Sequence, residues 1–336
     1  MFRRIVLFVV GFALIGAACA PDTPSGQPAT SSTEAPASQS TSSSTTASTS
    51  TTVPIPIDDG FPVTIEAENG PVTIGQRPER ILSLSPTSTE VLFAIDAGDQ
   101  VIAVDDQSNY PPEAPFTGLT SWQPNVEAIA EFDPDLVFIS FDPGDVIAGL
   151  EAVGITVILH SPAPDLATAF AQWEQTGVAS GHIAEAVALV GETQKRLIDA
   201  VRVVPDEASD LTYYYELDDL YFTATSSSFM GELLSATGLQ NVADLAPDPD
   251  GFGYPQLSTE FIVDADPALI LLADTKCCGQ NAETLAERPG WDTLSALSSG
   301  GVVELDDDIA SRWGPRIVEL FESVVAALVA VVSVDA

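Results

Sequence analysis

The chain has 336 residues, 45% of them hydrophobic, and its 49 Asp and Glu against 11 Lys and Arg give a formal net charge of −38. The length suits two domains with tails. A chain this acidic is repelled by nucleic acids and by anionic membrane surfaces. We therefore expect no nucleic-acid partner. Two His and three Cys are too few for a cage of several His around zinc or manganese, and we expect no metal site.

Residues 1–18 have the features of a secretory signal peptide. Two Arg precede an apolar run from Ile5 to Ile15, which is shorter than the about 20 residues of a membrane-spanning helix. Small residues lead from this run to Cys19, an arrangement that resembles the lipobox of bacterial lipoproteins, with Gly16 where those usually have Leu. We expect cleavage before Cys19 and lipidation of its thiol; the alternative is plain secretion with cleavage after Ala20.

Residues 19–57 form the predicted lipidated Cys and a disordered tether. Residues 20–57 hold 10 Ser, 9 Thr and six Pro in 38 residues, a composition that cannot bury enough apolar surface to fold. As a flexible coil, this segment spans on the order of 35 Å. We therefore expect an extracytoplasmic protein anchored to the outer face of the cell membrane, which touches the membrane through its lipid only.

The remaining chain alternates between apolar strands and helices. In its first half we predict strands at 81–85, 101–104, 136–141 and 156–159, and helices at 88–95, 126–132 and 146–153. In its second half we predict strands at 213–217, 221–224, 269–272 and 302–305, and helices at 230–237 and 316–332. Such alternation predicts an α/β fold of two Rossmann-like lobes, each with a parallel sheet covered by helices.

A sequence repeat indicates that the two lobes are duplicates. Glu127 recurs as Glu260, and the Asp-Pro pair that follows each of them recurs at the same separation of 133 residues. Asn125 and Ser258 each stand two positions before the Glu and are predicted helix N-caps.

One long helix is expected between the lobes. Residues 182–203 lack Pro and carry apolar residues at helical spacing, and 22 residues at about 1.5 Å each give roughly 33 Å. We therefore expect an N-terminal lobe at 58–181, a linking helix at 182–203 and a C-terminal lobe at 204–336. A single helix of this kind predicts limited hinge closure.

Six short motifs occur in an order typical of one family. They are Arg80–Pro86 with Thr89-Glu90, Asn109–Pro112, Ser121–Pro124 with Glu127, Tyr254–Ser258 with Glu260, Arg312, and Gly314–Arg316. From about residue 77 to 328 the chain resembles the substrate-binding proteins of ABC importers for iron chelates and cobalamin, and it is most similar to those that bind cobalamin.

The resemblance implies a receptor with a ligand cleft between its lobes, which delivers its ligand to a permease dimer driven by a cytoplasmic ATPase. Open α/β sheets bind ligands at the carboxyl ends of their strands, which independently favours such a cleft. The chain has no Gly-x-Ser-x-Gly elbow, Walker loop or Gly-x-Gly-x-x-Gly motif, so we expect no enzyme. We also expect no cofactor, the bound species being the transported corrinoid or iron chelate.

Large aromatic side chains in the loops are the candidate ligand contacts, because they grip a flat, bulky ligand with little loss of entropy. The alternative for each is core packing. The resemblance adds an acid and a base of the cobalamin pocket, for which the alternative is a loop salt bridge. The candidate ligand-binding residues are Tyr110, Trp122, Phe141, Tyr215, Tyr254, Asp308 and Arg312.

The resemblance also implies that Glu127 and Glu260 dock onto arginines of the permease, one on each lobe. The alternative is that each carboxylate complements the dipole of its own helix, an effect of about 0.3–1 kcal/mol.

Cys277 and Cys278 are adjacent, and exported proteins meet oxidising conditions. They can form a vicinal disulfide, since adjacent Cα atoms fall close to the permitted separation, or remain two free thiols.

The ligand is expected to carry little negative charge, because a ferric catecholate needs a basic cluster and the mature chain has only 11 − 2 = 9 Lys and Arg. A bulky corrinoid rimmed by amides fits best. The alternatives are a ferric hydroxamate siderophore or haem in the same importer class, and a ligand-sensing surface receptor that is not coupled to import.

Overall fold

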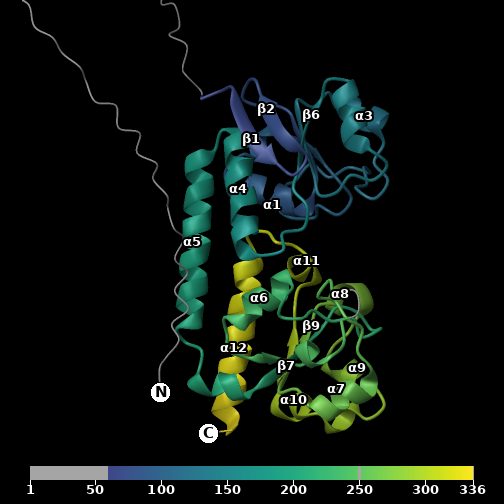
Figure 1. Cartoon of the computed structure of the whole chain (residues 1–336), viewed down its shortest axis with the longest axis vertical. Coiled ribbons are helices and arrows are strands. Elements are labelled where there is room, and N and C mark those ends of the chain that lie inside the picture. The colour runs from purple at the N-terminus through teal and green to yellow at the C-terminus, as the bar shows by residue number, and fades with distance from the viewer. Residues whose placement is uncertain (1–59, 249–250, 336) are drawn as a thin grey trace, which may run out of the picture. The chain divides into compact units, whose positions relative to one another are not determined.

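The computed structural model describes residues 60–248 and 251–335. The predicted signal peptide, Cys19 and the tether lie outside the described residues. The described residues belong to one compact unit, in which two α/β lobes lie one above the other (Figure 1). Among the described helices, none combines the length and the apolar composition needed to cross a membrane.

The first lobe contains a four-stranded parallel sheet with the order β4-β3-β5-β6. Its strands are short apolar runs that are mostly buried, as expected for a parallel sheet covered on both faces. An antiparallel hairpin that the sequence did not suggest precedes the sheet. The elements are β1 (Val63–Ala67), β2 (Gly70–Ile74), β3 (Ile81–Leu84), α1 (Pro86–Ala94), β4 (Val101–Val104), α2 (Val126–Ala130), β5 (Leu136–Ile139), α3 (Val146–Ala152) and β6 (Thr156–Leu159).

The second lobe contains a parallel sheet with the order β10-β9-β7-β8. Its strands are β7 (Thr212–Glu216), β8 (Gln240–Asn241), β9 (Leu269–Leu272) and β10 (Val302–Glu304). Its helices before the terminal one are α6 (Phe229–Ser235), α7 (Thr259–Ala265), α8 (Thr275–Cys278), α9 (Ala282–Ala286), α10 (Ser295–Ser299) and α11 (Asp307–Ala310). Short 3₁₀ helices occupy Gly98–Gln100, Asp206–Asp210, Val242–Leu245 and Trp291–Thr293.

The strand predicted at 221–224 does not form. Tyr221 has a φ of 67°, in the left-handed region that an extended strand does not allow. Phe222 makes only an isolated antiparallel bridge with Gln256. The segment is therefore an irregular loop after β7.

The two sheets have the same topology, as the sequence repeat predicted. When the strands of each lobe are numbered in chain order, both sheets read second-first-third-fourth. Strands β5 and β9 begin 269 − 136 = 133 residues apart. The helices before them, α2 and α7, begin at side-chain caps from Asn125 and Ser258, which accept from the backbone N–H groups three residues further on.

Three long helices connect and support the lobes. They are α4 (Leu166–Ser180), α5 (Ile183–Val201) and α12 (Ile317–Asp335). The sequence predicted α5 within two residues at each end, and Figure 1 shows it running beside both lobes. Only part of its apolar stripe is buried: Val190 and Leu197 face the core, whereas Ile183, Val187 and Ile198 are exposed.

The lobes also contact each other directly. Trp173 Nε1 of α4 donates to the backbone oxygen of Trp313 at 3.0 Å, and Trp313 Nε1 donates back to Gln172 Oε1 at 2.6 Å. Phe170 packs against the buried cores of both lobes. This packing, added to α5, supports the expectation that the lobes move little as rigid bodies.

Candidate functional site

Loops from the carboxyl ends of both sheets meet between the lobes. Strands β4 and β5 lead into residues 105–122 and 140–142, whereas β9 and β10 lead into 274–279 and 306–316. The loop after β7 is bonded to residues 252–256, for example through Thr225 N and the backbone oxygen of Gly253 at 2.8 Å. We call the surface formed by these six segments, with the loop after β7 taken as residues 217–228, the inter-lobe face. It lies where open α/β sheets bind ligands.

An ion-pair network centred on Glu90 joins the lobes beneath this face. Glu90 of α1 accepts from Arg312 Nη1 at 2.8 Å and from Arg316 Nε and Nη2 at 2.9 and 2.6 Å. The Glu90 side chain is 2% exposed, and those of Arg312 and Arg316 are 8% and 12% exposed. Charges buried to this extent need partners of opposite charge, and here Glu90 and the two arginines are partners of each other.

Arg312 and Asp308 lie together at the junction of the lobes. Arg312 Nη2 donates to the backbone oxygen of Gln107 and to Asn109 Oδ1, both at 2.9 Å, and to Asp308 Oδ1 at 3.1 Å. Asp308 also accepts from Asn109 Nδ2 at 3.1 Å. The pair is thus more than the loop salt bridge considered as an alternative, because it binds the first lobe. Its role toward a ligand stays a prediction.

Three predicted aromatics project from the inter-lobe face. Tyr110, Trp122 and Tyr254 are 42%, 68% and 47% exposed. The guanidinium of Arg316 lies over the ring of Tyr110, 4.0 Å from its centroid, and so holds this ring across the lobe boundary. Trp122 contacts Phe141, with ring centroids 5.0 Å apart and planes tilted by 42°. The exposed rings of these side chains form flat apolar surfaces, which we call the aromatic platforms.

Tyr215 is a correction to the predicted site. It lies in β7, which is flanked by β8 and β9, and its side chain is 1% exposed. A central strand of a parallel sheet is covered on both faces, so this side chain enters the core instead of the inter-lobe face. Burial raises the pKa of its hydroxyl. Tyr215 packs in the buried core of the second lobe.

Glu90 beneath the face was not predicted as a site residue, nor were Asn109, Lys276 and Arg316 on the face itself. Lys276 Nζ of α8 bonds Asp306 at 2.6 Å and Asp308 at 2.8 Å, which extends the network into the turn after β9. One signal was present in the sequence: Glu90 is the only charged residue of α1, a helix that is buried over most of its length. A charge in such a helix requires a partner.

The face carries no free cation among its described residues. Arg312 pairs with Glu90 and Asp308, Arg316 pairs with Glu90, and Lys276 pairs with two carboxylates. Within this network the carboxylates of Glu90, Asp306, Asp307 and Asp308 outnumber the three cations, and the face carries further exposed carboxylates at Asp106 and Asp142. Such a surface disfavours a polyanionic ligand and accepts a neutral or amide-rimmed one.

Glu127 and Glu260 occupy equivalent exposed positions in the first turns of α2 and α7. Within residues 60–248 and 251–335, neither carboxylate takes part in a hydrogen bond or ion pair. Both are therefore available to a partner molecule, one on each lobe.

The turn after β9 carries the two adjacent cysteines. The structure joins Cys277 and Cys278 by a disulfide, and both residues are exposed. Asp307 Oδ2 accepts from the backbone N–H groups of Lys276 and Cys277 at 2.9 and 2.8 Å. The disulfide is thus attached to the same acidic segment that bonds the first lobe.

A buried charged cluster lies behind this turn. Glu216, which is 0% exposed, binds Arg288 through two hydrogen bonds of 2.6 and 2.7 Å, and Arg288 stacks over Trp291. Asp274 is buried beside them, and neither of its carboxylate oxygens has a hydrogen-bond partner among the described residues. Burial, with the nearby Glu216 charge, raises the pKa of Asp274 to about 7.

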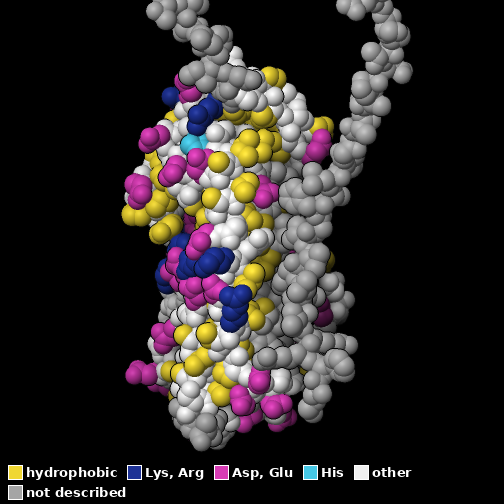
Figure 2. Space-filling model, turned by 90° about the vertical axis from the view of Figure 1, so that its left-hand side faces the viewer, with side chains coloured by type: hydrophobic (Ala, Val, Ile, Leu, Met, Phe, Trp, Pro, Cys, Tyr) yellow, Lys and Arg dark blue, Asp and Glu magenta, His cyan; other side chains and the backbone are white. Residues whose placement is uncertain are grey.

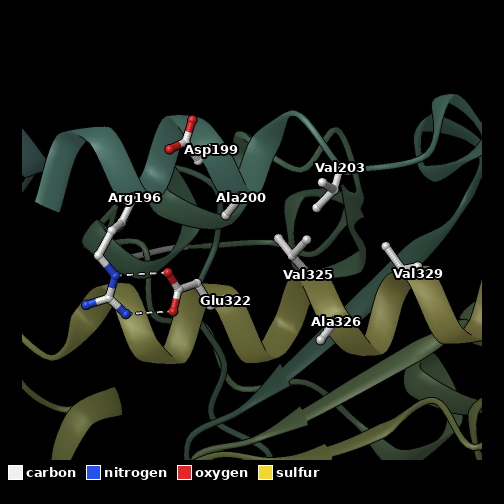
Figure 3. A pocket seen from close by; sticks show the side chains of 8 residues that line it. All are labelled: Arg196, Asp199, Ala200, Val203, Glu322, Val325, Ala326 and Val329. Atoms are coloured by element: carbon white, nitrogen blue, oxygen red, sulfur yellow. Dashed lines mark hydrogen bonds and ion pairs between the residues drawn. The ribbon is translucent and has the colours of Figure 1, made fainter. Parts of the chain in front are cut away.

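A pocket between α5 and α12 lies on another side of the molecule (Figure 3). Arg196 of α5 makes two hydrogen bonds of 3.0 and 2.6 Å to Glu322 of α12 at one end, and the remaining lining is Asp199 and small apolar side chains. Figure 2 shows the α5 side, where Lys and Arg gather next to Asp and Glu. No strand-end loop contributes to this pocket, so it is separate from the inter-lobe face. The described residues contain no group of three or more His, Cys, Asp or Glu that could hold a metal ion.

The fold is that of a two-lobe α/β protein in which loops from both sheets meet between the lobes. The chain belongs to the periplasmic binding protein family, whose model matches residues 81–309. The family and the relatives described next are binding proteins, which confirms the prediction of a protein that is not an enzyme.

Two curated relatives are 30% identical to this chain. One is YvrC of Bacillus subtilis, a substrate-binding lipoprotein of an ABC transporter, with 80% of this chain and 86% of the relative covered. The other is a cobalamin-binding protein of Halobacterium salinarum, with 77% and 72% covered.

Solved structures agree with the fold. The vitamin B12-binding protein BtuF of Vibrio cholerae is 25% identical, with a TM-score of 0.59 and 75% and 97% covered. The haem-binding protein HmuT is 20% identical, with a TM-score of 0.63 and 80% and 90% covered, and this likeness is one of fold alone.

Proposed function

We propose that this protein is an extracytoplasmic receptor that captures a bulky chelate, a corrinoid in the first place, and delivers it to an ABC importer. The observation that carries the proposal is the inter-lobe face, where Tyr110, Trp122 and Tyr254 project from loops at the strand ends. Open aromatic platforms suit a large ligand with flat apolar surfaces. The cobalamin-binding and substrate-binding relatives support the same assignment.

The charges of the face support the choice of ligand class. Every described cation on the face is paired with a carboxylate, so an anionic ligand would meet a surface with an excess of negative charge. Haem, with its propionates, and ferric catecholates are disfavoured on this ground. A corrinoid rimmed by uncharged amides, and next a neutral ferric hydroxamate, meet no such penalty.

Titration of the purified protein with cyanocobalamin, a ferric hydroxamate and haem tests the ligand. We expect saturable binding of cyanocobalamin at micromolar or lower concentration. Quenching of tryptophan fluorescence reports this binding, because Trp122 is 68% exposed on the face. Saturation by haem or by the hydroxamate, with no cyanocobalamin signal, overturns the choice of a corrinoid but leaves the proposed receptor function intact. No binding of any of the three contradicts the proposed class of ligand.

Delivery to a permease is proposed from Glu127 and Glu260. Two equivalent, unpaired carboxylates on duplicated lobes suit a partner with two-fold symmetry, and hydrogen bonds from arginine would fix the orientation of the complex. The chain would be held near that permease by the lipid on Cys19. A permease dimer with a cytoplasmic ATPase is the partner that this arrangement implies.

A further inference from the structure

The disulfide turn, residues 276–279, stands on the inter-lobe face. Strand β9 ends at Leu272, and α8 follows it after two residues, closed by Gly279 in the left-handed conformation. Figure 1 shows α8 and α11 on the side of the second lobe that faces the first. Cys277 and Cys278 are both exposed there, although disulfides usually staple distant parts of a chain. A disulfide between neighbouring residues closes no loop of the fold, so it can act only on the structure and surface of the turn itself.

The turn is bonded to the residues that join the lobes. Asp307 accepts from the backbone N–H groups of residues 275, 276 and 277, at 2.8, 2.9 and 2.8 Å. Lys276 Nζ bonds Asp308 at 2.8 Å, and Asp308 in turn accepts from Asn109 of the first lobe at 3.1 Å. The disulfide turn is therefore linked to the first lobe through two side-chain contacts, Lys276 with Asp308 and Asp308 with Asn109.

The oxidation state of the turn changes the surface that it presents. The ring formed by two adjacent half-cystines fixes both side chains and offers two polarizable sulfurs without a hydrogen-bond donor. Two free thiols are mobile, and each can donate. Only the oxidised form is a rigid apolar surface suited to the flat edge of a bulky ligand.

We propose that the Cys277–Cys278 disulfide is a redox-sensitive ligand contact of the inter-lobe face, which binds an apolar edge of the chelate in its oxidised form. The inference rests on the proposed receptor function. Reduction by a dithiol breaks the S–S bond: two electrons and two protons pass to the cysteines, and the dithiol becomes a disulfide. The reduced turn binds the ligand more weakly.

Affinity in the two redox states tests the proposal. Full-length protein is titrated with cyanocobalamin as purified, after treatment with dithiothreitol and its removal, and after reoxidation, with free thiols counted each time. We expect about tenfold weaker binding after reduction, the size of a good sulfur–aromatic contact, and recovery on reoxidation. Cys277→Ser with Cys278→Ser should bind like the reduced protein and should not respond to dithiothreitol.

Ligand protection of the disulfide is a second readout. By thermodynamic linkage, a tenfold preference of the ligand for the oxidised form lowers the reduction potential of the disulfide by about 30 mV when the ligand is bound. The Cys277→Ala with Cys278→Ala variant, checked for an unchanged unfolding temperature, separates loss of the contact from loss of the fold.

The outcomes separate the two proposals. Equal affinity of the oxidised and reduced forms, with cyanocobalamin bound by both, overturns the disulfide contact and leaves the receptor function intact. Absence of binding to the oxidised protein overturns the corrinoid receptor and, with it, the contact.

Discussion

Glu90 links two arginines that come from the other end of the sequence. It is separated from Arg312 and Arg316 by 222 and 226 residues, yet all three side chains are almost fully removed from water. Desolvating three charges is costly, and the cost is offset only while both arginines keep their carboxylate. The ion-pair network between the lobes therefore depends on one side chain.

Glu90→Ala is expected to lower the free energy of unfolding by about 3–5 kcal/mol, because it leaves two buried cations without their carboxylate. Glu90→Gln, which retains the shape and an acceptor, should lose less. Urea denaturation measures both effects. Lys195→Ala serves as the control, since it removes an exposed ion pair with Asp199 and should leave the urea midpoint unchanged. A Glu90→Ala midpoint equal to that of the wild type would contradict the role given to Glu90.

Asp274 predicts a pH dependence of stability. Its pKa is raised from 3.8 to about 7, so between these values the folded protein holds a proton that the unfolded chain has lost. The folded state then binds more protons, and the contribution of Asp274 to stability falls as the pH rises from about 4 to 7 and stays low above it. Asp274→Asn should therefore raise the unfolding temperature more at pH 8 than at pH 5.

Comparison of each variant with the wild type at the same pH cancels the titration of every other group. Asp292→Asn, at an exposed position, is the control and should shift the unfolding temperature equally at both pH values. An equal shift for Asp274→Asn would show that this carboxyl group is not held in its protonated form.

The close approach of α4 and α5 depends on a glycine. A Cβ at Gly177 would lie 2.4 Å from the Cβ of Ala186 and 3.0 Å from the backbone oxygen of His182. Gly177→Ala should therefore force the helices apart and lower the free energy of unfolding by about 1–3 kcal/mol.

Gly191→Ala is the matched control within α5. A Cβ there meets no atom within 4 Å, so the better helix propensity of Ala should raise stability by about 0.5–1 kcal/mol. Chemical denaturation of both variants gives the comparison. Stabilisation by Gly177→Ala would show that the two helices do not pack as closely as described.

The elements with plain patterns could be predicted from the sequence. Strands β6 and β9 have the predicted bounds, because apolar runs between turn signals are the usual mark of buried parallel strands. Helix α4 was missed because its buried side includes Gln172, Thr176 and Ser180, which break the apolar stripe. Gln172 bonds Ser161 and Trp313, whereas Thr176 and Ser180 donate to backbone oxygens one turn earlier in α4. Polar residues satisfied in these ways leave no periodic apolar signal.

The candidate site could be predicted only in part, because single residues stand out in a sequence but their distant partners do not. Trp122 and Tyr254 were found as aromatics in Pro-flanked loops, and they are exposed on the inter-lobe face. Tyr215 was misplaced because a strand's sequence does not tell how closely its neighbours cover it. The partners of Glu90 lie more than 200 residues away, a distance over which residue patterns in one sequence carry no pairing information.

At the scale of the whole molecule, duplication places one exposed, unpaired carboxylate on each lobe, and we propose that both dock on the permease. We expect Glu127→Ala with Glu260→Ala to leave ligand affinity and unfolding temperature nearly unchanged, while association with the permease and uptake fall sharply. Neither side chain is used elsewhere in the described structure, so its loss should be felt only by a partner. Uptake by whole cells and co-purification with the permease measure the effect.

Glu151→Ala with Glu287→Ala is the control for docking, since it removes two other exposed carboxylates, one from each lobe. The control should transport normally. If the Glu127 and Glu260 variant also transports normally, the carboxylates only complement their helix dipoles, and docking uses another surface.

The most direct test of the account is calorimetric titration of cyanocobalamin into the wild type and the Trp122→Ala with Tyr254→Ala variant. The account predicts saturable binding to the wild type. It also predicts a loss of about 30-fold or more in the variant, because a single aromatic hot spot is worth about 2 kcal/mol. Val153→Ala with Leu245→Ala, which removes two exposed apolar side chains outside the inter-lobe face, should keep the wild-type affinity. Equal affinity of the wild type and the Trp122 and Tyr254 variant would contradict the claim that the ligand binds between the lobes.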